Sequence, residues 1–128
     1  MKIATDIDTT NLVGKVFKYN GRGPEIYDCW GLVMEIYRRS GIELPDYNSP
    51  SAWKDIADLM SRELIRWQQI EEKPGAVIGL RTNERMHHVG ICLPFGKFIH
   101  ASESKGMVAI ESIRFWERNI VGYYGFVG

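Results

Sequence analysis

The spacing of hydrophobic side chains changes along the chain from the period of a helix to the period of a strand. Between Asp28 and Gly41, apolar side chains recur as they do on one face of an α-helix. This stripe consists of Cys29, Leu32, Val33, Ile36 and Tyr37. A second stripe predicts another helix from about Ser51 to Ile65. From Ala76 onward the period is two, which is typical of strands with one buried face.

The residues at the two ends of the first helix agree with this prediction. Asp28 is a good N-cap, because its carboxylate can accept hydrogen bonds from the amides of the first turn. Gly41 fits the left-handed position that follows the last turn. Cys29 is therefore expected in the first turn, on the buried face. Gly31 costs helix stability, and close packing against another backbone would explain its presence.

The second half of the chain predicts five short strands with turn residues between them. They run over residues 76–80, 88–93, 97–101, 107–110 and 121–127. Helices that precede strands indicate an α+β domain, with N-terminal helices packed on a C-terminal antiparallel sheet of about five strands. A chain of 128 residues is the size of one domain, so residues 1–128 are expected to form a single domain.

The length of one hairpin loop predicts which residues share a face of the sheet. Leu93 and Lys97 flank a three-residue loop, which is typically a type I turn followed by a left-handed glycine. If these two residues pair, then Ile91 pairs with Ile99. His88 and His100 then become diagonal neighbours on one face, within reach of each other. His87 points to the opposite face.

These positions suggest a thiol enzyme. If the first helix packs on the face that carries both histidines, Cys29 meets His88 and His100. A thiolate nucleophile is favoured by a helix N-terminus and by an adjacent imidazolium, and a third polar group orients the imidazole. Cys29 is the candidate nucleophile, His88 the general base and later acid, and His100 the orienting residue. The backbone amide of Cys29 is a candidate oxyanion donor.

Two other interpretations use the same residues. A helical cysteine is commonly a small core residue, and the histidines could be ordinary hydrogen-bonded side chains. Alternatively, the three residues could hold zinc with Cys92 or Asp28 as the fourth ligand, although no Cys-x-x-Cys or His-x-x-x-His pair is present. We interpret Cys92 as a core residue.

Composition and charge exclude several classes of protein. The 16 Lys and Arg residues balance the 16 Asp and Glu residues, which argues against a nucleic-acid partner. No apolar run approaches the roughly 20 residues that span a bilayer, so no membrane segment is expected. The acidic N-terminus has no apolar core, so we expect synthesis in the cytoplasm without a signal peptide. Two cysteines do not make a disulfide scaffold.

Five short motifs, in this order, resemble the NlpC-type cell-wall endopeptidases, which are papain-like cysteine peptidases of bacteria and their phages. They are 27–33 (YDCWGLV), 41–45 (GIELP), 73–77 (KPGAV), 88–93 (HVGICL) and 97–102 (KFIHAS). Cys29, His88 and His100 match the catalytic residues of that family. The resemblance implies hydrolysis of peptidoglycan stem peptides between D-γ-glutamyl and a diamino acid. It implies no metal and no cofactor.

The sequence departs from the family pattern at two positions. Trp30 follows the cysteine where the family often has serine, and Phe17 stands where the family often has tyrosine, with Tyr19 two residues further on. Asp28, Trp30 and Tyr19 are the candidate residues for binding substrate or stabilising an oxyanion. The Asp-Cys-Trp-Gly-Leu form looks most like proteins of phage and prophage tail tips, which implies tail proteins as partners and release by a virion or another delivery machine.

Two further functions remain open on the same residues. Relatives with this fold also transfer acyl groups, so a thiol acyltransferase or amidase is one alternative. The other is a non-catalytic module that binds a phage tail or a cell wall, which the departures at Phe17 and Trp30 would allow.

Overall fold

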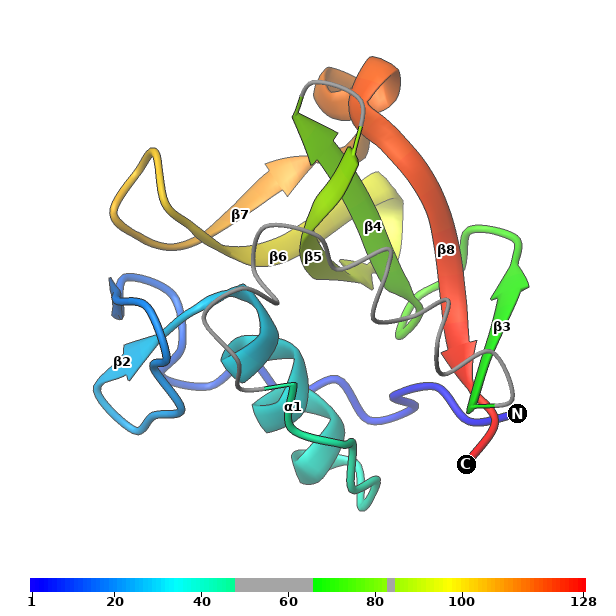
Figure 1. The fold of residues 1–128 in the computed structure, drawn as a ribbon, viewed down its shortest axis with the longest axis horizontal. Helices are drawn as coiled ribbons and strands as arrows, with labels where there is room; N and C mark the ends of the chain where they lie inside the picture. Colours follow the sequence, from blue (N-terminus) through cyan, green and yellow to red (C-terminus); the bar gives the residue numbers. More distant parts are fainter. Residues whose placement is uncertain (48–65, 83–84) are drawn as a thin grey trace.

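The computed structural model describes residues 1–47, 66–82 and 85–128, and these form a mixed α+β fold (Figure 1). The elements in chain order are β1 (Val16–Phe17), β2 (Ile26–Tyr27), α1 (Cys29–Arg39), β3 (Trp67–Ile70), β4 (Val77–Thr82), β5 (Arg85–Leu93), η3 (Pro94–Gly96), β6 (Lys97–Ser102), β7 (Met107–Ser112), η4 (Ile113–Asn119) and β8 (Ile120–Phe126). The helix expected over 51–65 lies outside the described residues. In the described part, no helix is long and apolar enough to cross a membrane.

The sheet has eight strands in these residues, so the prediction of about five strands is wrong. Their order is β2-β1-β7-β6-β5-β4-β8-β3. The five predicted strands are all present, as β4 to β8. The additional strands are short pieces at the two edges of the sheet, and β1 and β2 have only two residues each. A two-residue strand has no measurable periodicity, so the sequence pattern could not reveal it.

Helix α1 begins and ends where the sequence predicts. Asp28 is the N-cap and accepts from the backbone N–H of Gly31, and Gly41 has a left-handed φ of 80°. The predicted apolar stripe is buried along its whole length. A Cβ atom at Gly31 would collide with the carbonyl oxygen of Gly21, so the prediction of close backbone packing is confirmed.

The sheet buries side chains on both faces. Helix α1 packs on one face of the sheet (Figure 1). This face consists of Val77, Val89, Ile91, Ile99, Ala101 and Val108. The other face carries a second core cluster, closed by Ile113 of η4, with Ala76, Ile78, Leu80, Cys92 and Phe98. Cys92 is fully buried in this second cluster, which confirms that it is a core residue.

The β5–β6 hairpin has the predicted register but a different turn. Leu93 pairs with Lys97 and Ile91 with Ile99. The turn is not type I, because Phe95 has φ 64° and ψ 36°, in the left-handed region. A type I turn would place this residue near φ −90°. Two consecutive left-handed residues, Phe95 and Gly96, therefore reverse the chain.

Replacing Phe95 with glycine is expected to stabilise the domain. The Phe95 side chain is 99% exposed, so it contributes little packing, and its left-handed backbone costs about 1 kcal/mol. Part of this gain is offset by the entropy that glycine loses on folding. We expect Phe95→Gly to raise the midpoint of thermal unfolding by about 2 °C. Phe95→Ala keeps the left-handed penalty and should not raise the midpoint, and an equal rise in both variants would contradict this account.

Candidate active site

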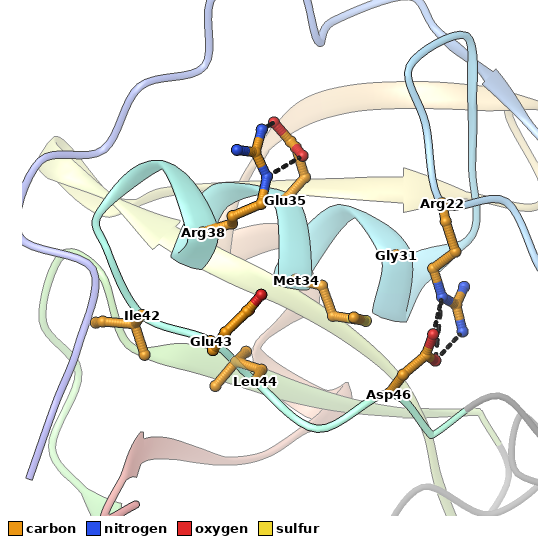
Figure 2. Close-up of a pocket in the computed structure, with 9 residues that line it drawn as sticks. All are labelled: Arg22, Gly31, Met34, Glu35, Arg38, Ile42, Glu43, Leu44 and Asp46. Atoms are coloured by element: carbon orange, nitrogen blue, oxygen red, sulfur yellow. Dashed lines mark hydrogen bonds and ion pairs between the residues drawn. The ribbon is translucent and has the colours of Figure 1, made fainter.

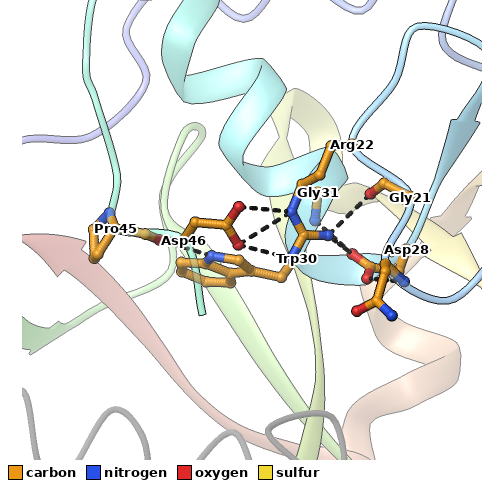
Figure 3. Close-up of polar contacts among 8 residues, drawn as sticks. Gly21, Arg22, Asp28, Trp30, Gly31, Pro45 and Asp46 are labelled. Carbon is orange, nitrogen blue, oxygen red and sulfur yellow. Dashed lines mark hydrogen bonds and ion pairs between the residues drawn. The ribbon is translucent and has the colours of Figure 1, made fainter. Parts of the chain in front are cut away.

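The N-terminus of α1 is fixed by the carboxylate of Asp28, which is buried and accepts from three donors (Figure 3). The backbone N–H of Gly31 donates to it at 2.7 Å, that of Asn20 at 2.8 Å, and Nη1 of Arg22 at 2.8 Å. Burial raises the pKa of Asp28, while these donors act in the opposite direction. Asp28 thus ties the loop before the helix to the turn that carries Cys29.

Arg22 extends this network to the segment that follows the helix. Its guanidinium contacts Asp46 at 2.8 Å as well as Asp28, and it donates to the carbonyl of Gly21 at 3.0 Å (Figure 3). The indole of Trp30 donates to the carbonyl of Pro45 at 2.9 Å. The first turn of α1 is therefore held from both sides.

Cys29 lies at the start of α1 with its sulfur against the peptide that joins His88 to Val89. The backbone N–H groups of Val89 and Trp30 lie near this sulfur, and both act to lower the pKa of the thiol. Cys29 is only 5% exposed, and burial, with a smaller contribution from the charge of Asp28, raises the pKa of the thiol to about 12. The N–H groups at the start of the helix act to lower the pKa of the thiol, as expected, but desolvation outweighs them in this state.

The two histidines contact each other, as the loop length predicts. His88 Nε2 and His100 Nδ1 lie 2.6 Å apart, and their rings meet edge to face. His100 is fully buried, and its other nitrogen, Nε2, is hydrogen-bonded to the carboxylate of Glu111. Burial lowers the pKa of His100, although Glu111 acts in the opposite direction. Glu111 was not predicted, because it comes from β7, whose register on β6 cannot be read from the hairpin loop.

The assumption that α1 packs on the histidine face is wrong. His100 packs on Phe98 and Trp116, which belong to the face opposite α1. The helix instead covers the odd-numbered positions of β5 and β6, where a continuous aliphatic surface matches its own stripe. The thiol nevertheless reaches the backbone beside His88, through the N–H of Val89.

The remaining candidate residues have different environments. Trp30 is fully buried, with its ring packed on Tyr47 and Trp67, so its indole presents no surface to a substrate in this structure. Tyr19 is 56% exposed, and its hydroxyl donates to Glu103 and lies within electrostatic range of the Cys29 thiol. Phe17 packs edge to face on Tyr19, with ring centroids 5.3 Å apart. Tyr19 therefore carries an exposed hydroxyl next to the ring of Phe17.

The zinc interpretation requires both histidines as ligands, and their contact does not suit it. Two nitrogens 2.6 Å apart are hydrogen-bonded to each other, so they do not both point a lone pair at one ion. In the described part of the chain, no group of three or more His, Cys, Asp and Glu side chains is arranged to hold a metal ion.

A pocket of about 190 Å³ lies on the side of α1 that faces away from the sheet (Figure 2). Its walls are Arg22, Gly31, Met34, Glu35 and Arg38, together with residues 42–44 and Asp46 from the following segment. Neither Cys29 nor the two histidines line it. The pocket is therefore separate from the thiol site.

The chain belongs to the NlpC/P60 family, whose model matches residues 14–124. A relative named "Probable endopeptidase p60" in Listeria innocua is 26% identical over 113 residues, which cover 87% of this chain and 22% of the relative. The chain thus spans about a fifth of the length of these curated relatives.

Solved structures show the same fold. NlpC1 from Trichomonas vaginalis is 27% identical with a TM-score of 0.64, and the match covers 88% of this chain and 40% of that one. The NlpC/p60 domain of peptidoglycan hydrolase SagA has a TM-score of 0.60 at 16% identity, covering 88% of this chain and 87% of the other. The mixed α+β architecture is thus that of NlpC/P60 domains.

Proposed function

We propose that this chain is a cysteine endopeptidase that hydrolyses the stem peptides of peptidoglycan. Cys29 is its nucleophile, His88 its general base, and His100 orients His88. The observation that carries the proposal is the position of the thiol against the His88–Val89 peptide, combined with the His88–His100 contact. Membership of the NlpC/P60 family supports it, as do the names of the relatives, an endopeptidase and a peptidoglycan hydrolase.

The raised pKa of the thiol defines the first step. With a pKa of about 12, Cys29 is a neutral thiol at pH 7, so it must lose its proton as it attacks. The proton moves to His88 while sulfur bonds to the carbonyl carbon of the substrate. The backbone amide of Cys29 stabilises the oxyanion. His88 then protonates the leaving amine as the C–N bond breaks, and water hydrolyses the thioester and regenerates the thiol.

Tyr19 is proposed as the residue that provides the hydroxyl missing at Phe17. Its exposure, and its position within electrostatic range of the thiol, suit contact with a substrate. The contact with Glu103 raises the pKa of Tyr19, so the hydroxyl keeps its proton. The hydroxyl directs this proton at Glu103 in this structure, and it must turn away from Glu103 to donate to an oxyanion or a substrate carbonyl.

The bond and the biological setting are finer proposals. The family motifs support cleavage between D-γ-glutamyl and a diamino acid, and the Asp-Cys-Trp-Gly-Leu sequence supports association with a phage or prophage tail. Digestion of defined muropeptides, with identification of the products by mass, tests the bond. Release of a free diamino-acid amine supports it. Cleavage at another bond of the stem peptide would support the peptidase activity but contradict the proposed bond. Muropeptides that remain intact would contradict the peptidase activity itself.

The alternative of a non-catalytic module makes a different prediction for the thiol. If His88 takes the proton, Cys29 should react with iodoacetamide at pH 7 at least 100-fold faster in the wild type than in His88→Ala. In that variant His88 cannot take the proton, so the reaction depends on the small thiolate fraction of a thiol whose pKa is raised by burial, and the rate should rise about tenfold per pH unit. Mass spectrometry separates adducts on Cys29 and Cys92, and Cys92 serves as the internal control.

Equal rates at Cys29 in the two proteins would favour the non-catalytic module. An acyltransferase would have the same reactive thiol, so it is distinguished from a hydrolase by the molecule that accepts the acyl group. Adding an amine acceptor to the muropeptide digest should leave hydrolysis the main outcome, and products that carry the amine would favour transfer.

A further inference from the structure

Three neighbouring strands each contribute one polar side chain to a continuous hydrogen-bonded row. His88 of β5 contacts His100 of β6, and His100 contacts Glu111 of β7. Glu111 pairs directly with Phe98 in the β6–β7 ladder, while His100 pairs with Ala109. Residues two apart on a strand share a face, so Glu111 lies diagonally beside His100 on the face that carries both histidines.

The chemistry of these three groups fixes where the protons lie. A carboxylate only accepts hydrogen bonds, so His100 Nε2 must carry a proton toward Glu111. A neutral His100 then has its lone pair on Nδ1, which must accept from His88 Nε2–H. His88 is consequently the tautomer with its lone pair on Nδ1, the nitrogen that does not face His100.

The surroundings favour these protonation states. Burial lowers the pKa of His100, and Lys105 acts in the same direction, so the ring is neutral near pH 7. Burial raises the pKa of Glu111, but hydrogen bonds from His100 and Trp116 and the charge of Lys105 outweigh this, so its pKa is below the ordinary value and the group is a carboxylate. Lys105 lies 3.7 Å from Glu111.

We infer that Glu111 is a positioning residue, which sets the tautomers of His100 and His88 so that Nδ1 of His88 is the atom that accepts the proton of Cys29. This inference rests on the proposed function for its catalytic meaning. Without Glu111, His100 could place its proton on either nitrogen. If His100 carried its proton on Nδ1, it would donate to Nε2 of His88. His88 would then carry its own proton on Nδ1, and that atom could not accept the proton of Cys29.

The decisive measurement is nitrogen-15 NMR of the histidine side chains of the whole protein at pH 8. In the wild type, both His88 and His100 should be Nε2–H tautomers. A proton on Nδ1 of either ring would overturn the inference without any substitution. In Glu111→Leu, we expect signals of mixed tautomers for both rings. In Glu111→Gln, the amide oxygen can still accept from Nε2–H, and the wild-type tautomers should return in part.

A second readout connects the tautomers to the thiol. Glu111→Leu should slow the alkylation of Cys29 at pH 7 by about 10- to 100-fold. Glu117→Leu, at an exposed glutamate of the neighbouring η4, is the matched control and should change neither the rate nor the tautomers. If tautomers shift as expected but no muropeptide is cleaved, the positioning role stands and the proposed function fails. If the wild type cleaves muropeptides while Glu111→Leu keeps both tautomers, the proposed function stands and the positioning role of Glu111 fails.

Discussion

Cys29→Ala is expected to abolish peptidoglycan hydrolysis while leaving the fold intact. The substitution removes the only proposed nucleophile, and loss of a nucleophile in a triad costs a factor of at least about 10⁴ in rate. The packing lost is a single sulfur atom at a site that is 5% exposed, so we expect a cost of about 1 kcal/mol and a midpoint lowered by only a few degrees. The measurement is the release of new amino groups from purified peptidoglycan, beside thermal unfolding of the same samples.

The matched control is Cys92→Ala. Cys92 is the other cysteine of the chain, is fully buried and lies in the core cluster on the opposite face of the sheet. Its truncation should cost at least as much stability as that of Cys29 but leave hydrolysis at the wild-type rate. Hydrolysis that persists in Cys29→Ala would remove the thiol mechanism. Equal loss of activity in both variants would show that the effect comes from stability alone.

The parts of the structure that the sequence predicts correctly are those that depend on nearby residues. Asp28 and Gly41 mark the ends of α1 because capping needs only the adjacent turn. The length of the loop between Leu93 and Lys97 sets the β5–β6 register, and the register brings His88 and His100 together. These predictions need no knowledge of the rest of the fold.

The parts that the sequence does not predict depend on contacts between distant segments. The burial of Trp30 depends on Pro45 and Tyr47, which return beside the helix after it ends. Glu111 reaches His100 only through the pairing of β7 with β6. The raised pKa of Cys29 follows from its burial, which is a property of the packed domain, whereas the helix N-terminus can be seen in the sequence. The candidate residues of the site can therefore be predicted from their sequence neighbours, whereas their pKa values depend on the packed domain.

Gly31→Ala is expected to have the largest effect on stability, because it acts at the contact that holds the start of α1. A methyl group there would collide with the carbonyl oxygen of Gly21, which accepts both the backbone N–H of Asp28 and the guanidinium of Arg22. The loop cannot move away without breaking these bonds. Overpacking costs about 3 kcal/mol here, and the higher helix propensity of alanine returns about 1 kcal/mol. We expect a net loss of about 2 kcal/mol and a midpoint lowered by about 8 °C.

Gly31→Ala should also lower the reactivity of Cys29. This effect distinguishes it from a substitution that only lowers stability. Displacing Asp28 shifts the first turn and moves the Cys29 sulfur away from the N–H of Val89. Alkylation of Cys29 at 25 °C, where the variant is still folded, should therefore slow by at least tenfold. The control is Gly41→Ala at the other end of α1, where a Cβ meets no neighbouring atom but the left-handed backbone costs about 1 kcal/mol. Gly41→Ala should lower the midpoint and leave the Cys29 rate unchanged. An equal slowing in both variants would show that the thiol responds to global stability and not to the Gly21–Gly31 contact.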